Sequence, residues 1–105
     1  MIKVYFFTNS DGELLGFNVQ GHSGFGVYES DVVCSAVSSA VYMAANTITE
    51  IMNIDSDVSI EEGKMFFRIY KPTSCCRDVL MGLKLHLMTL EEQYPENIKV
   101  NYAEV

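Results

Sequence analysis

The sequence predicts an α+β fold: a single five-stranded, mostly antiparallel sheet with two helices packed on one face. Three observations predict it: short segments alternating between apolar and polar residues, two long segments with helical apolar spacing, and tight-turn signals between strand-like segments. The elements follow the order ββαββαβ. With 105 residues, 49% of them apolar, the chain is long enough to bury a core as one domain, residues 1–105.

The first two strands are predicted to form a hairpin. Residues 2–8 alternate and are rich in β-branched and aromatic types. The tetrapeptide Asn-Ser-Asp-Gly at 9–12 is a strong turn signal. The return strand is predicted over about 14–21, so the pair is antiparallel.

A long helix is predicted after a glycine-containing loop at 24–30. Asp31 is expected to be its N-cap, because the carboxylate can accept the amide hydrogen of Cys34, three residues later. Apolar residues then recur at helical spacing to about Met52. Small residues in the first half of this helix would let it lie close to the sheet or leave space beside it.

A second hairpin and a last strand complete the sheet. Residues 58–61 and 64–70 read as strands that turn at Glu62-Gly63, and residues 98–102 supply the fifth strand. Four strand aromatics exceed what two helices can cover; these are Tyr5, Phe7, Phe66 and Tyr70. They indicate a self-association surface, a peptide groove or simply more core.

The second helix is predicted to begin at Pro72-Thr73-Ser74, with Thr73 or Ser74 as N-cap, and to end at Pro95. Two apolar stripes run along it. The first stripe consists of Cys76, Leu80, Leu83, Leu87, Leu90 and Tyr94, and the second of Met81, Leu85 and Met88. Apolar residues on two sides are a further sign of self-association.

Charge and cysteine content exclude several classes of function. A net charge of −7 argues against direct contact with nucleic acid and favours a basic polypeptide as partner. Only two histidines and no Cys-x-x-Cys argue against a metal site, and we expect no cofactor. The N-terminus is unlike a signal peptide, and no stretch approaches the roughly 20 apolar residues of a membrane span. We therefore expect a soluble, cytoplasmic protein with reduced thiols.

The candidate catalytic pair is His22 and Cys34. His22 lies in Gly-His-Ser-Gly at the end of the second predicted strand, and Cys34 is expected in the first turn of the following helix. A cysteine attacks as a thiolate, which both a helix N-terminus and a nearby imidazolium stabilise. Either residue alone is more often structural, so it is the pair that points to chemistry.

Other residues near the pair have supporting roles or none. Gly21 and Gly24 allow sharp bends beside His22, and Asp31 is expected to cap the helix and anchor the loop. Ser38, one turn after Cys34 on the same face, could bond His22 or the substrate, or equally its own helix. No third member of a triad is evident.

At Gly21-His22-Ser23-Gly24 and Asp31-Val32-Val33-Cys34-Ser35-Ala36-Val37-Ser38 the chain resembles the ribosomal-processing cysteine protease family. The resemblance extends over essentially the whole chain. It implies a catalytic dyad at His22 and Cys34, a homodimer and a loop over the site. It also implies a substrate, the large-subunit ribosomal protein number twenty-seven, whose short N-terminal extension is cleaved after two phenylalanines.

In the expected mechanism His22 takes the thiol proton, Cys34 attacks the carbonyl, and amide hydrogens near the helix start, including that of Cys34, hold the oxyanion. Two other functions compete. One is a non-enzymatic, acidic ribosome-assembly factor that binds a basic ribosomal protein. The other is a redox or acyl-transfer protein that uses Cys75 or Cys76.

Overall fold

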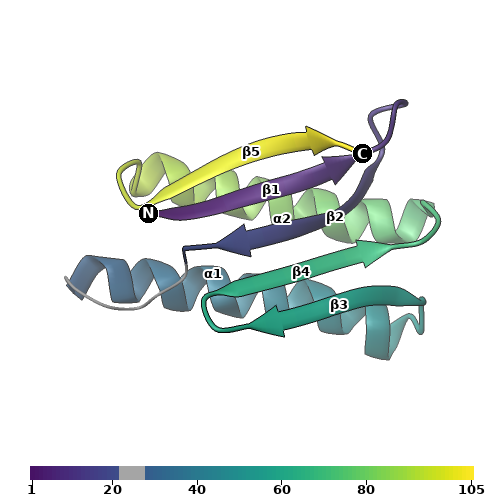
Figure 1. Cartoon of the computed structure of the whole chain (residues 1–105), viewed down its shortest axis with the longest axis horizontal. Coiled ribbons are helices and arrows are strands. Elements are labelled where there is room, and N and C mark those ends of the chain that lie inside the picture. Colours follow the sequence, from purple (N-terminus) through teal and green to yellow (C-terminus); the bar gives the residue numbers. More distant parts are fainter. Residues whose placement is uncertain (22–27) are drawn as a thin grey trace.

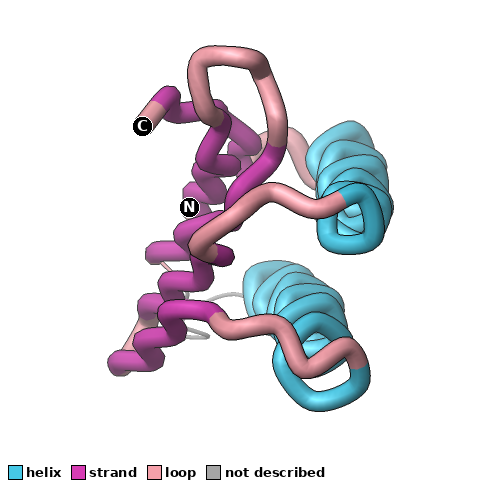
Figure 2. Tube along the Cα trace, turned by 90° about the vertical axis from the view of Figure 1, so that its right-hand side faces the viewer, coloured by secondary structure: helices cyan, strands magenta, loops and turns pink. Residues whose placement is uncertain are grey.

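The computed structural model describes residues 1–21 and 28–105, with only the backbone described at 28–31. The elements are β1 (Ile2–Thr8), β2 (Leu14–Gln20), α1 (Tyr28–Asn46), a π-helical turn (Thr47–Ile51), β3 (Ser56–Glu61), β4 (Lys64–Ile69), α2 (Ser74–Gln93) and β5 (Ile98–Glu104). The strand order is β3-β4-β2-β1-β5, and among these described strands only β1 and β5 pair in parallel. Both helices lie on one face of the sheet (Figures 1 and 2), which confirms the predicted fold class.

The turn between β1 and β2 follows from its sequence. The Asn9 side-chain oxygen accepts hydrogen bonds from the backbone N–H groups of Asp11 and Glu13, both at 3.0 Å. Gly12 has a φ of 79°, which favours glycine. A short polar side chain and a left-handed glycine thus close the predicted hairpin.

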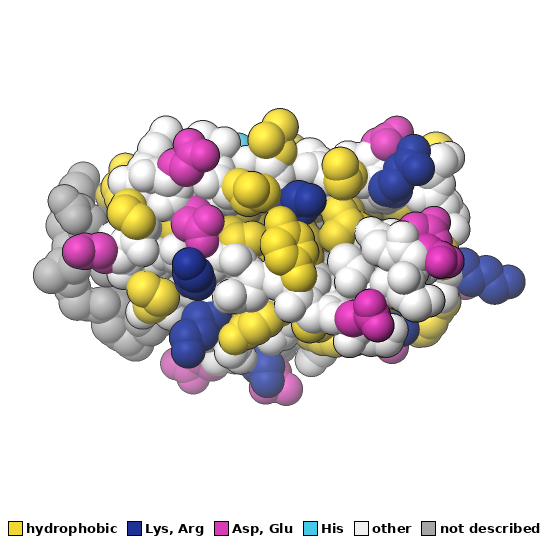
Figure 3. Space-filling model, turned by 90° about the horizontal axis from the view of Figure 1, so that it is seen from above, with side chains coloured by type: hydrophobic (Ala, Val, Ile, Leu, Met, Phe, Trp, Pro, Cys, Tyr) yellow, Lys and Arg dark blue, Asp and Glu magenta, His cyan; other side chains and the backbone are white. Residues whose placement is uncertain are grey.

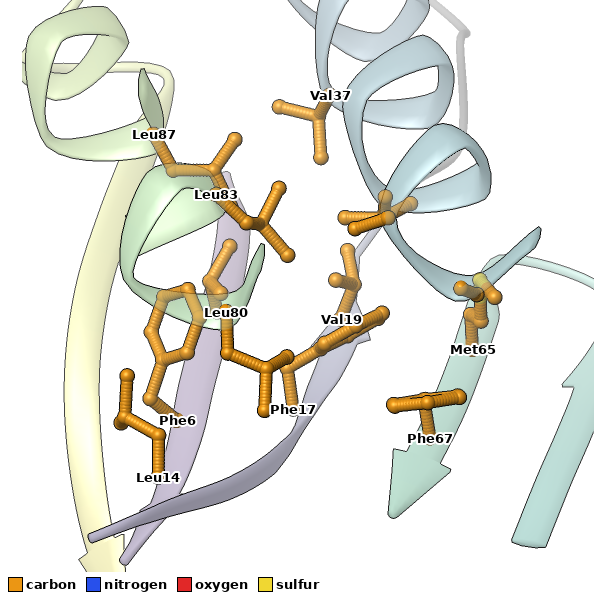
Figure 4. Close-up of a cluster of buried hydrophobic side chains, with 14 of the residues drawn as sticks. Phe6, Leu14, Phe17, Val19, Val37, Met65, Phe67, Leu80, Leu83 and Leu87 are labelled. Atoms are coloured by element: carbon orange, nitrogen blue, oxygen red, sulfur yellow. The ribbon is translucent and has the colours of Figure 1, made fainter. Parts of the chain in front are cut away.

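The core lies between the sheet and the two helices (Figure 4). Phe17 and Phe67, on neighbouring strands, stack with ring centroids 5.3 Å apart, and Phe6 meets Phe17 edge-on at 6.5 Å. From α2 the first predicted stripe contributes its buried members, Cys76, Leu80, Leu83, Leu87 and Leu90. Burial of alternate strand residues therefore fixes which face of the sheet the helices cover.

The start of the first helix differs from the prediction. The helix begins at Tyr28, so Asp31 is its fourth residue and not its N-cap, and Cys34 is its seventh. The periodic apolar stripe begins only at Val33, so the turn before it carries no apolar pattern by which sequence could detect it. Of the predicted loop at 24–30, residues 28–30 are helical and the rest lie outside the described residues.

The segment Val32–Ile51 corrects a second expectation. Its 20 residues have a mean hydropathy of 1.4, which meets the length and composition of a membrane span. A core helix of a soluble protein meets the same criterion. Here Val33, Val37 and Val41 face the sheet and are buried in the core, which accounts for much of this apolar character.

Candidate active site

The end of β2 leads the chain to the histidine motif. Gly21 has a φ of 77°, and a Cβ there would overlap the backbone carbonyl of Met1. Glycine is therefore required at this position both by the backbone conformation and by the close approach of the N-terminus. His22 and Gly24 lie outside the described residues.

Cys34 lies in the second turn of α1, with its residue surface 6% exposed. In an α-helix only the first four N–H groups lack a partner within the helix. The seventh residue is not among them, so the expected place of Cys34 in the first turn is wrong, and the prediction that its amide holds an oxyanion loses that physical basis. Asp31 is in the first turn of the helix, and its side chain lies outside the described residues.

A pocket of about 140 Å³ connects the surroundings of the two motifs. Val19 of β2, three residues before His22, lines it together with Ser38 of α1, one turn after Cys34. Four residues along a helix correspond to a rise of about 6 Å. The fold therefore brings the strand before the histidine and the helix bearing the cysteine to one hollow.

The remaining lining residues come from α1 and from the β3–β4 hairpin. They are Val41 and Tyr42 of α1 and Ile60, Glu61, Gly63, Lys64 and Met65 of the hairpin. Sequence reasoning missed the hairpin, because its approach depends on the pairing of β4 with β2. The lining is mainly apolar, with one acid and one base at the hairpin turn.

The other cysteines lie elsewhere. Cys75 is exposed and Cys76 is buried, both at the start of α2. In Figure 1 that start is at the opposite end of the sheet from the start of α1. Among the side chains of residues 1–21 and 32–105, no three His, Cys, Asp or Glu are placed to hold a metal ion.

We compared the sequence and the fold with those of known proteins. The model of the family described as cysteine protease Prp matches residues 1–99. The chain belongs to the cysteine protease Prp family. The ribosomal processing cysteine protease Prp of Staphylococcus aureus is 28% identical to it, over 97% of this chain and 99% of the relative.

Two crystal structures of an S. aureus ribosomal processing protease Prp are also similar. One, in complex with a substrate peptide, is 26% identical with a TM-score of 0.91, covering 98% of this chain and 100% of that one. The other holds a covalently linked product peptide, with 27% identity, a TM-score of 0.86 and the same coverage. This chain is accordingly a cysteine protease of the Prp family with the Prp fold.

Proposed function

We propose that this protease removes the short N-terminal extension of large-subunit ribosomal protein number twenty-seven, with Cys34 as nucleophile and His22 as general base and acid. The observation that carries the proposal is the pocket lined by Val19, just before the histidine motif, and by Ser38, the last residue of the cysteine motif. The similar S. aureus structure with a covalently linked product peptide supports covalent catalysis.

The chemistry needs only the two side chains and water. His22 takes the thiol proton while the Cys34 sulfur attacks the carbonyl carbon, whose oxygen takes up the electron pair. His22 returns the proton to the amine as the C–N bond breaks, and a thioester remains on Cys34. Water then attacks the thioester, releases the carboxylate product and restores the thiol.

The pocket gives a basis for substrate selection. Val19, Val41, Ile60 and Met65 offer apolar surface, and the volume of about 140 Å³ suits one apolar side chain next to the scissile bond. Ser38 is placed at the same hollow, where its hydroxyl can bond the peptide backbone. We assign this pocket to one of the two phenylalanines.

The net charge of −7 supports attraction of a basic ribosomal protein by long-range electrostatic steering. We propose that the cleavage takes place in the cytoplasm, before ribosome assembly is complete. Gly21 and Gly24 would shape the backbone that carries His22.

We also propose that the protease is a homodimer formed through α2. Met81, Leu85 and Met88 form one stripe along the helix, and Leu85 is 69% exposed. Tyr102 of β5 adjoins the stripe, with its hydroxyl donating to Met88 Sδ at 3.7 Å. Figure 3 looks onto the side where β5 and α2 lie and shows hydrophobic side chains gathered across it. One stripe on one helix can meet its own copy about a two-fold axis.

The dimer is tested by one substitution. Leu85→Glu should give a monomer by size-exclusion chromatography with light scattering, because it places two carboxylates at the centre of the contact. Leu85→Met should remain dimeric. A dimer that survives Leu85→Glu would rule out this surface.

The proposed function is tested with the extended ribosomal protein itself. Incubation with the purified protease should give one cut, after the second phenylalanine, as measured by intact mass. Replacing both phenylalanines of the substrate by alanine should abolish the cut, because the apolar pocket is then left unfilled. Cleavage at another bond, or equal cleavage of the alanine substrate, would contradict the proposal.

A further inference from the structure

We propose that the face of the sheet opposite the helices binds single-stranded RNA. Figure 2 shows both helices on the other side, and no described element covers this one. Strand register arranges its side chains in three rows across the sheet, which we call the open face. The rows are Lys99, Lys3, Gln20, Lys64 and Glu61; then Asn101, Tyr5, Asn18, Phe66 and Ser59; then Ala103, Phe7, Gly16, Arg68 and Asp57.

The charge of the open face is opposite to that of the chain. It carries four of the seven cationic side chains but only two of the fourteen acidic ones. One of these two acids, Asp57, already accepts a hydrogen bond from the Tyr70 hydroxyl at 3.1 Å, and that bond raises the pKa of Tyr70. The open face therefore carries a local excess of positive charge, although the whole chain has a net charge of −7. The expectation of no contact with nucleic acid was based on the charge of the whole chain and does not apply to this face.

Aromatic rings lie among these cations. The Phe7 and Phe66 rings are 5.4 Å apart between centroids and inclined at 45°. Tyr5 lies in the same row as Phe66, with Asn18 between them. Three of the four predicted excess strand aromatics, Tyr5, Phe7 and Phe66, are thus found on this face. Rings on a sheet with lysines nearby form a platform on which unpaired bases stack.

A hollow of about 370 Å³ lies on the open face, lined by Phe7, Asn18, Ser59, Glu61, Lys64 and Phe66. The side-chain oxygen of Asn18 is buried there and has no hydrogen-bond partner among the described residues. A buried acceptor without a donor costs free energy, and the amino group of a base would supply that donor. Phe66 would then stack on the base while Lys64 meets its phosphate.

These features favour RNA over a second copy of the chain. Two open faces in contact would bring an excess of positive charge against itself. The acidic remainder of a second copy could meet the open face only head to tail, which does not close into a dimer. Asn18, Asn101, Gln20 and Ser59 offer amides and a hydroxyl that can bond the ribose 2′-hydroxyl.

Fluorescence anisotropy with the full chain and a labelled 12-nucleotide single-stranded RNA of mixed sequence tests the proposal between 50 and 200 mM salt. With four cations engaged, log K should fall against log[salt] with a slope of about −2 to −3. The Lys3→Gln/Lys99→Gln variant should lower the slope by about 1.4. The Lys71→Gln/Arg77→Gln variant, which removes the same charge outside the three rows, should leave the slope unchanged.

Stacking is tested separately. Phe66→Leu should lose about tenfold in affinity, whereas Phe66→Tyr should keep it, with circular dichroism confirming that both fold. The proposal is overturned by absence of binding at 50 mM salt, by equal loss in both charge variants, or by unchanged affinity of Phe66→Leu. Equal affinity for duplex RNA, or for DNA of the same sequence, also overturns the proposal. It is likewise overturned if Phe66→Leu changes the dimerisation of the protein but not its affinity for RNA. None of these measurements uses the protease activity, so this proposal and the proposed function can fail separately.

Discussion

Cys34 and Cys76 are both buried near the beginning of a helix that covers the sheet, yet their surroundings differ. Cys76, the third residue of α2, is fully buried, and its N–H donates to the Thr73 hydroxyl at 3.1 Å. Cys34, the seventh residue of α1, lies one turn from a pocket lined by three parts of the chain. Both cysteines belong to the buried core, but Cys76, which is nearer to its helix N-terminus, lies on α2, and none of the described residues of α2 lines that pocket.

This comparison changes the reason for assigning Cys34. Sequence reasoning favoured Cys34 partly for an expected place in the first turn, where free N–H groups stabilise an anion. By that criterion Cys76 would rank higher. What distinguishes Cys34 is the pocket that Ser38 lines one turn further along the same helix. Such a pocket arises from tertiary packing and not from position within a helix.

The largest expected effect comes from matched substitutions of the two cysteines. Cys34→Ala should lower the rate of extension cleavage by at least about 10⁴-fold, because the attacking atom is lost. Cys76→Ala should keep the rate and lose about 1 kcal/mol of stability from a small cavity. Cleavage assays and urea unfolding of both variants measure this. Activity retained by Cys34→Ala and lost by Cys76→Ala would move the nucleophile to α2.

A smaller effect is expected from His22→Ala, about 10²–10⁴-fold in kcat/KM, because general acid and base catalysis is lost. If His22 also stabilises the thiolate, the pH profile of Cys34 alkylation should move to higher pH in this variant. Peptide mapping after iodoacetamide treatment follows the label on each cysteine. A profile that stays in place would mean that His22 does not act on the sulfur.

Most of the fold could be predicted because local patterns and tertiary packing agree. The strands at 2–8 and 14–20, the second hairpin and the cap at Thr73 are confirmed at or close to the predicted positions. The helix start at Tyr28 was missed, because the residues of its first turn, Tyr-Glu-Ser-Asp, carry no apolar periodicity in the sequence. Boundaries of this kind depend on where the chain enters from its loop.

The site could be predicted only in part. The motifs at Gly21–Gly24 and Asp31–Ser38 carry residue types that name the chemistry, so His22, Cys34 and Ser38 could be proposed directly. Ile60 and Met65 line the pocket only because β4 pairs with β2, across more than 40 residues of chain. Their apolar character looks the same as that of any strand residue, so sequence gives no signal of that role.

The smallest effect is expected at Thr73, the N-cap of α2, which accepts a hydrogen bond from the Cys76 N–H. Thr73→Ala removes the acceptor for the Cys76 N–H and should lower stability by about 1 kcal/mol, or about 4–8 °C in Tm, with cleavage unchanged. Thr73→Ser keeps a hydroxyl and should keep the stability, which thermal unfolding measures. A loss of cleavage in Thr73→Ala at a temperature where it remains folded would link α2 to catalysis. The conclusion that α1 serves catalysis while the start of α2 serves only stability would then be wrong.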